Sequence, residues 1–235
     1  MNPTPSPRPL HEPRDVRLSL PGAELEGSLA LPEKASGLVL FAHGSGSSRH
    51  SPRNRYVAEI LQGAGLGTLL MDLLTHDEDA VDEFTSQFRF DIGLLADRLA
   101  GAIDWLEQQP ETRELPIGLF GASTGAAAAL QAAAARPNRI RAVVSRGGRP
   151  DLAGEALGHV RAPTLLIVGA DDTPVIPLND VALRQMEAPA EMRLVPGASH
   201  LFEEPGTLAA ASALARDWFV RHLALEAHSG SSGSA

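Results

Sequence analysis

The chain has 235 residues, contains no cysteine and carries a formal net charge of −9 at pH 7. The lack of cysteine excludes disulfides, thiolate metal sites and a cysteine nucleophile, and the negative charge disfavours a broad nucleic-acid or anionic-membrane surface. The length suits a single α/β domain, so small-molecule chemistry is the most economical expectation.

The two ends of the chain differ in composition from the rest. Residues 1–15 are rich in proline and lack an apolar segment, which argues against a signal peptide or membrane span and favours a tail on a cytoplasmic protein. Residues 227–235 are dominated by serine and glycine, as in a flexible tail or an artificial extension. We therefore expect one folded domain over residues 16–226.

An antiparallel hairpin is expected at the start of this domain. Polar and apolar residues alternate over 16–20 and 24–31, on either side of Pro21-Gly22, as in a strand pair at a sheet edge. The continuous apolar run 37–42 then predicts a strand buried on both faces. It leads into loop 43–48, whose glycines and serines leave backbone amides open to a ligand.

The next segments alternate between helix and strand. Apolar spacing predicts a helix over 52–63, a buried strand over 67–73 and a long amphipathic helix over 88–109. The acidic segment 75–83 breaks this periodicity and is predicted to be a loop.

A Gly-x-Ser-x-Gly pattern lies between an apolar run and an alanine-rich run. Ser123 stands at its centre, with Gly121 and Gly125 on either side. The five-residue pattern alone fits any loop of small residues. Its place between a predicted strand and a predicted helix indicates a nucleophile elbow, a sharp turn that exposes a reactive serine above a sheet.

Strands and helices continue to alternate to the end of the domain. This alternation predicts right-handed parallel crossovers and a doubly wound, mostly parallel sheet with an antiparallel N-terminal edge. The remaining strands are expected at 140–145, 164–169 and 191–195, and the remaining helices at 177–186 and 207–225.

A nucleophilic serine needs a histidine as base and an acid behind it. Asp171 and Asp172 follow the strand that ends at Gly169, and His200 follows the last strand. Both loops leave the carboxyl ends of strands, where ligand crevices of such sheets lie. We prefer Asp172 because Pro174 and Val175 follow it closely, with Asp171 as the alternative. Among the 8 histidines, only His200 lies between the last strand and the last helix.

Backbone amides are expected to stabilise the oxyanion of the reaction. The amide of Thr124, directly after the nucleophile, and that of Ser45 are the predicted donors. His43 is expected to orient its loop rather than act as a second base. Histidines and carboxylates do not fall at metal-ligand spacings, so neither a metal nor a cofactor is expected.

Two basic segments have two possible roles. Arginines are concentrated in 49–55 and recur at Arg146 and Arg149 near the expected site. They could capture an anionic group of a substrate, or they could pair with the acidic residues of segment 77–83.

The chain resembles the α/β-hydrolase superfamily from Val16 to Leu225, and more narrowly the dienelactone-hydrolase-like group, including hydrolase domains fused to phosphoribosyltransferases. Residues 43–54, 145–152 and 196–203 carry the likeness. The resemblance implies an α/β-hydrolase fold, here with an open site and no large lid domain. Dienelactone hydrolases have a cysteine where Ser123 stands. The resemblance therefore implies a serine carboxylesterase more than a lactonase. No phosphoribosyltransferase half is recognised.

These inferences converge on a serine hydrolase of small-molecule esters, with no nucleic-acid or membrane partner. Ser123 attacks the ester, His200 transfers the proton and Asp172 orients His200. Acyl transfer, lactone hydrolysis and amide hydrolysis could use the same three residues. A binding or regulatory protein that has kept the fold without activity is the alternative of another class. The oligomeric state is not predicted.

Overall fold

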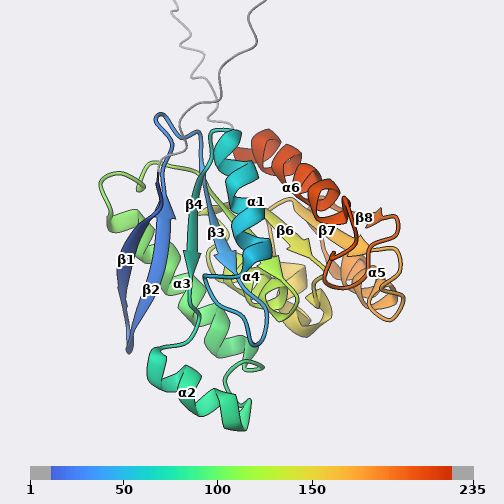
Figure 1. Cartoon of the computed structure of the whole chain (residues 1–235), viewed down its shortest axis with the longest axis horizontal. Helices are drawn as coiled ribbons and strands as arrows, with labels where there is room; N and C mark the ends of the chain where they lie inside the picture. Colours follow the sequence, from blue (N-terminus) through green and yellow to red (C-terminus); the bar gives the residue numbers. More distant parts are fainter. Residues whose placement is uncertain (1–11, 224–235) are drawn as a thin grey trace, which may run out of the picture.

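The computed structural model describes residues 12–223 and contains an eight-stranded sheet in the order β1-β2-β4-β3-β5-β6-β7-β8 (Figure 1). β1 pairs antiparallel with β2, and β2 pairs antiparallel with β4. All other neighbours are parallel. The predicted mostly parallel sheet with an antiparallel N-terminal edge is confirmed.

Most predicted elements lie where the sequence pattern put them. The strands are β1 Arg14–Leu20, β2 Ala23–Ala30, β3 Leu38–Ala42, β4 Gly67–Met71, β5 Ile117–Ala122, β6 Ile140–Arg146, β7 Thr164–Gly169 and β8 Ala190–Val195. The helices are α1 Pro52–Gly63, α2 His76–Thr85, α3 Ile92–Gln108, α4 Thr124–Ala135, α5 Ile176–Gln185 and α6 Thr207–Leu223, with a 3₁₀ segment η1 at Pro150–His159.

The predicted tails fall largely outside the described residues, which exclude 1–11 and 224–235. Arg14 and Asp15, expected in the tail, already belong to β1. Between β6 and β7 the described chain forms only the short η1 and no lid domain. Across residues 12–223, no helix has both the length and the apolar character needed to cross a bilayer.

The central strands are buried on both faces, which explains their uninterrupted apolar sequences. On β3, Leu38 and Leu40 contact the core layer that contains α3 and α4. Val39 and Phe41 alternate with them and contact the opposite layer, which contains α1 and α6. The two layers cover the sheet from both sides and hold its carboxyl edge rigid.

The prediction of a loop over residues 75–83 is wrong, because α2 occupies most of that segment. Thr75 Oγ1 accepts a hydrogen bond from the Glu78 amide at 3.2 Å, and the Glu78 carboxylate accepts one from the Thr75 amide at 2.8 Å. This capping box satisfies two backbone donors at the helix start. Asp77, Glu78 and Asp79 also lie in the first turn, where negative charge favours a helix. Figure 1 shows α2 beyond the carboxyl ends of β3 and β4.

The long helix starts later than its apolar spacing predicts. The side chain of Asp91 accepts a hydrogen bond from the Leu94 amide at 3.0 Å and caps α3, which therefore begins at Ile92 rather than at residue 88.

Candidate active site

Ser123 occupies the tight turn between β5 and α4, with backbone angles φ 52° and ψ −124°. Such a conformation costs a non-glycine residue on the order of 1–3 kcal/mol and persists only where its surroundings enforce it. The Ser123 carbonyl accepts hydrogen bonds from the amides of Ala126 (3.1 Å) and Arg149 (3.0 Å). The Ser123 amide donates to the Arg146 carbonyl at 3.3 Å. These contacts hold the serine above the carboxyl edge of the sheet.

The two glycines of the pattern are required by close backbone packing. A Cβ atom on Gly121 would lie 2.4 Å from the Cα of Ala126. A Cβ atom on Gly125 would lie 2.4 Å from the carbonyl oxygens of both Ala42 and His43. Strand β5, helix α4 and the end of β3 therefore approach one another only because these side chains are absent.

Gly125→Ala is expected to lower the free energy of unfolding by about 3 kcal/mol or more, because rigid backbone atoms must move. Gly63→Ala is the matched control, since a Cβ atom there meets nothing within 4 Å. We expect the control to change stability by no more than about 1 kcal/mol, and to raise it. Urea unfolding of both variants measures the difference. Equal midpoints would show that the elbow does not depend on this packing.

In the structure the side chain of His200 lies between those of Ser123 and Asp172 and contacts both. Ser123 Oγ lies 3.4 Å from His200 Nε2, and His200 Nδ1 lies 2.7 Å from Asp172 Oδ2. Donation from Nδ1 to the carboxylate leaves Nε2 as the acceptor that faces the serine. The 3.4 Å distance is long for proton transfer, as is common without substrate. Asp172 is 8% exposed, whereas the alternative, Asp171, is exposed and makes no contact of this kind.

The acid and histidine loops are fastened to each other. The Asp171 amide donates to the Ala198 carbonyl at 3.0 Å. A Cβ atom on Gly169 would lie 2.2 Å from the same carbonyl oxygen, so the two loops touch. The Glu204 carboxylate accepts a hydrogen bond from the Ser199 amide at 3.1 Å and fixes the residue before His200. Glu204 was not among the predicted site residues, although an acid four residues after the histidine could have suggested it.

The backbone amides of Thr124 and Ser45, the two predicted oxyanion donors, differ in whether they already donate a hydrogen bond within the protein. Thr124 is the first residue of α4, so its amide has no acceptor within the helix. The Ser45 amide, however, donates to Thr124 Oγ1 at 3.0 Å. This hydrogen bond must exchange before the Ser45 amide can donate to an oxyanion, and the role of Ser45 as a donor stays a prediction. Gly44 lies closest to the nucleophile, since a Cβ atom there would be 3.0 Å from the Cβ of Ser123.

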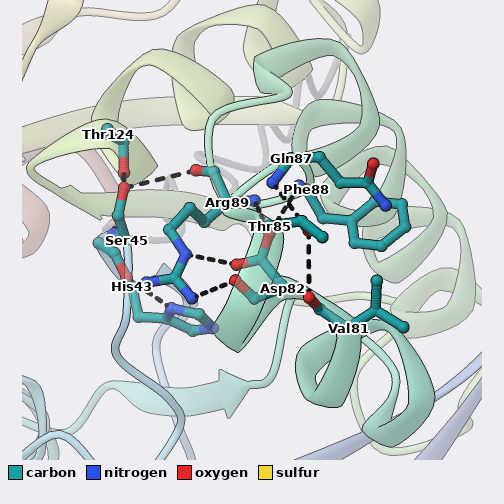
Figure 2. A network of polar contacts seen from close by, with 10 residues as sticks. His43, Ser45, Val81, Asp82, Thr85, Gln87, Phe88, Arg89 and Thr124 are labelled. Carbon is teal, nitrogen blue, oxygen red and sulfur yellow. Dashed lines mark hydrogen bonds and ion pairs between the residues drawn. The ribbon is translucent and has the colours of Figure 1, made fainter.

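A polar network connects this loop to α2 (Figure 2). The Ser45 hydroxyl lies 2.8 Å from Thr124 Oγ1 and donates to the Arg89 carbonyl at 3.4 Å. The Arg89 guanidinium pairs with the carboxylate of Asp82, which is 1% exposed. That carboxylate also accepts the amide of Phe88 at 2.6 Å. Figure 2 shows the Arg89 side chain turned toward Asp82 while its backbone faces Ser45.

His43 uses both ring nitrogens within the protein. Nδ1 lies 3.0 Å from the Gly44 carbonyl, and Nε2 accepts a hydrogen bond from the Leu73 amide at 3.1 Å. This pattern requires the neutral imidazole, and burial lowers the pKa of His43 below its usual value of 6.5. The arrangement matches a role in orienting loop 43–48 rather than a role as a second base.

Two clefts lie along loop 43–48, and the nucleophile lines the smaller of them. The larger, of about 460 Å³, lies between loop 43–49 and the segment that connects β4 to α2. The smaller, of about 50 Å³, is lined by Ser123, His200 and Arg146 among others. Gly44 and Ser47 line both clefts, so the two clefts share a wall at loop 43–48.

The basic segments do not pair with segment 77–83. Arg49 pairs with Asp72 and Glu26, and Arg53 pairs with Glu203. Arg149 pairs with Asp151. The pairing alternative is therefore wrong for these arginines, and Arg146 has no carboxylate partner among residues 12–223. Over the same residues, no three histidine or carboxylate side chains gather as metal ligands.

Comparison with known proteins identifies the family of this fold. The sequence model of the Dienelactone hydrolase family matches residues 25–224, most of the chain. The chain belongs to the dienelactone hydrolase family. It therefore has the α/β-hydrolase fold that the resemblance implied, and it is a hydrolase by family.

Similar proteins include relatives of known structure. A dienelactone hydrolase from Anabaena variabilis is 59% identical, with a TM-score of 0.88 over 90% of this chain and 99% of that chain. A serine hydrolase without a lid from Xanthomonas campestris is 23% identical, with a TM-score of 0.71 over 91% of this chain and 97% of that chain. At that identity, the second similarity shows the fold alone.

A longer relative also matches. A Mycobacterium tuberculosis protein, named provisionally as a phosphoribosyl transferase, is 59% identical over 197 residues. The match covers 84% of this chain but only 44% of that relative. The chain thus spans less than half the length of the curated relative.

Proposed function

We propose that this hydrolase is a serine carboxylesterase that cleaves short-chain carboxylic esters through an acyl-enzyme. The observation that supports it most is the continuous contact from Ser123 through His200 to Asp172. A serine hydroxyl is a weak nucleophile at neutral pH, and this chain of contacts supplies the base and the oriented acid that it needs.

The proposed reaction has two halves. His200 Nε2 takes the proton of Ser123 Oγ as that oxygen attacks the ester carbonyl carbon, and the carbonyl electron pair moves to the oxygen. The Thr124 amide stabilises this oxyanion. The tetrahedral intermediate collapses, and the alcohol leaves with the proton from His200. Water then loses a proton to His200 and attacks the acyl carbon, which forms a second tetrahedral intermediate. As this intermediate collapses, His200 returns the proton to Ser123 Oγ and the carboxylic acid leaves.

The positive charge that forms on His200 explains the need for Asp172. The carboxylate accepts a hydrogen bond from Nδ1–H, with 2.7 Å between Nδ1 and Oδ2, and so stabilises the imidazolium during both halves. A lactone is a cyclic ester and would be opened by the same steps. Phosphoribosyl transfer is not part of this proposal, because the matched residues are only 44% of the relative that carries that name.

The size of the clefts and the short connection between β6 and β7 favour small acyl groups. We expect kcat/KM for p-nitrophenyl acetate and butyrate to exceed that for the palmitate by about 10-fold or more, since each extra buried methylene needs apolar wall that the site lacks. Spectrophotometric assay of the ester series, with a lactone included, measures this preference. Faster cleavage of palmitate would refute the short-chain specificity.

A further inference from the structure

Arg146 lies beside the nucleophile without taking part in the proposed proton transfer. It is the last residue of β6, and its carbonyl accepts the hydrogen bond of the Ser123 amide at 3.3 Å. Its side chain is 7% exposed and lines the same small cleft as Ser123 and His200. A guanidinium is thus buried at the point where substrate must bind.

This guanidinium has few partners within the protein. Nη2 donates to Asn54 Oδ1 at 3.3 Å. Nε and Nη1 are buried and have no hydrogen-bond partner among the described residues. The guanidinium carbon lies 5.9 Å from the ring centre of Phe120 and 5.8 Å from that of Phe202. The aromatic rings hold the side chain in place but do not satisfy its donors.

The energetic balance of this burial is unfavourable. An unpaired buried charge costs more free energy than a desolvated cation–π contact returns. Burial, together with the nearby Arg53, lowers the pKa of Arg146 to about 10. The side chain therefore remains charged at neutral pH, and the described residues supply no anionic partner for it.

The other walls of the cleft also favour an anion. Ser51 caps the N-terminus of α1, and Arg53 and Asn54 lie in its first turn. The positive end of a helix attracts negatively charged groups. Ser47 and Ser51 supply hydroxyl donors, and no carboxylate side chain lines the cleft.

We propose that this cleft binds a phosphate group carried by the ester substrate. Arg146 and Arg53, a helix N-terminus and two hydroxyls offer more donors than the two oxygens of a carboxylate use, and they match the oxygens of a phosphate. Arg53 Nη1 also pairs with Glu203 at 3.1 Å, so its remaining nitrogens are the ones available to the phosphate. The cleft volume of about 50 Å³ suits a group of this size, since each water-sized atom needs roughly 10–15 Å³. Arg146 and Arg53 would then determine specificity, while Ser123 and His200 carry out the chemistry.

The role of this site in turnover rests on the proposed esterase function, but phosphate binding can be measured without any ester. Isothermal titration calorimetry of the wild-type protein with inorganic phosphate, at constant ionic strength, tests the site directly. We expect saturable binding of phosphate and binding of acetate at least about tenfold weaker, since acetate carries one charge and two acceptor oxygens. Acetate binding as tight as phosphate binding would overturn the assignment of a phosphate group.

Matched variants locate the binding. Arg146→Met should weaken phosphate binding by at least about tenfold, because it removes a charged partner from a buried contact. Arg141→Met, at the exposed residue near the amino end of the same strand, should leave binding unchanged. Unchanged phosphate affinity in Arg146→Met would overturn the proposal.

Arg53→Gln provides a second test at a less buried position, in case Arg146→Met does not fold. The Arg53 side chain is 37% exposed, so its replacement leaves the core intact. We expect phosphate binding to weaken by about threefold or more, in line with a partly screened charge. If Arg53→Gln binds phosphate as tightly as the wild type, the cleft is not the phosphate site.

Discussion

Ser123→Ala should lower kcat for p-nitrophenyl acetate by roughly 10⁶-fold, the loss expected when the nucleophile of a Ser-His-Asp triad is removed. The methyl group of alanine keeps the turn at φ 52° but offers no oxygen to attack the ester. The nearby hydroxyls of Ser45 and Thr124 are already hydrogen-bonded to each other at 2.8 Å. Steady-state assays at saturating ester measure the loss.

Ser36→Ala is the matched control for this substitution. Ser36 lies just before β3, at the amino end of the strand and therefore at the opposite edge of the sheet from Ser123. We expect wild-type kcat for this variant. Ester turnover by Ser123→Ala within tenfold of the control would mean that another group is the nucleophile.

Asp172→Asn is expected to lower kcat by roughly 10⁴-fold while the fold is retained. An amide in place of the carboxylate can present an N–H to His200 Nδ1, which favours the tautomer that carries its proton on Nε2. Nε2 then cannot accept the proton of Ser123, and the imidazolium loses its negative partner. Because asparagine has nearly the same shape, the loss appears in kcat rather than in stability.

Asp171→Asn separates this effect from a general effect of charge in the loop. Asp171 is adjacent in sequence but exposed, and its side chain does not contact His200. We expect its kcat to stay within about twofold of the wild type, as for surface substitutions. The reverse ranking of the two variants would assign the acid to Asp171.

Much of the fold could be predicted from the sequence because the strong signals are local. Strands β3, β5 and β7 are buried along their whole length, so each appears as an unbroken apolar run. The elbow glycines mark places where backbones touch. Asp172 and His200 could be proposed because the loops after parallel strands share one edge of the sheet.

The errors arose where side chains decide the structure. Helix α2 buries no apolar side chain, only Asp82, and its start depends on the reciprocal hydrogen bonds of Thr75 and Glu78. That pairing is visible in the sequence as a capping pattern, but the acidic composition obscured it. The engagement of the Ser45 amide could not be predicted, because it depends on a hydroxyl 79 residues away.

The environment of Arg146 is likewise a property of the folded chain. Its neighbours Asn54, Phe120 and Phe202 come from three separate segments, so the sequence alone left anion binding and ion pairing equally open. Only the folded arrangement separates Arg146 from the arginines that have carboxylate partners. The same strand end thus positions the nucleophile through its backbone and the proposed anion site through its side chain.

Mass spectrometry of the protein after treatment with a fluorophosphonate probe tests most directly whether Ser123 is an activated nucleophile. We expect one probe molecule per chain, attached to the peptide that contains Ser123, and much slower labelling in Asp172→Asn. An unlabelled protein, or a label confined to another residue, would contradict the proposed function.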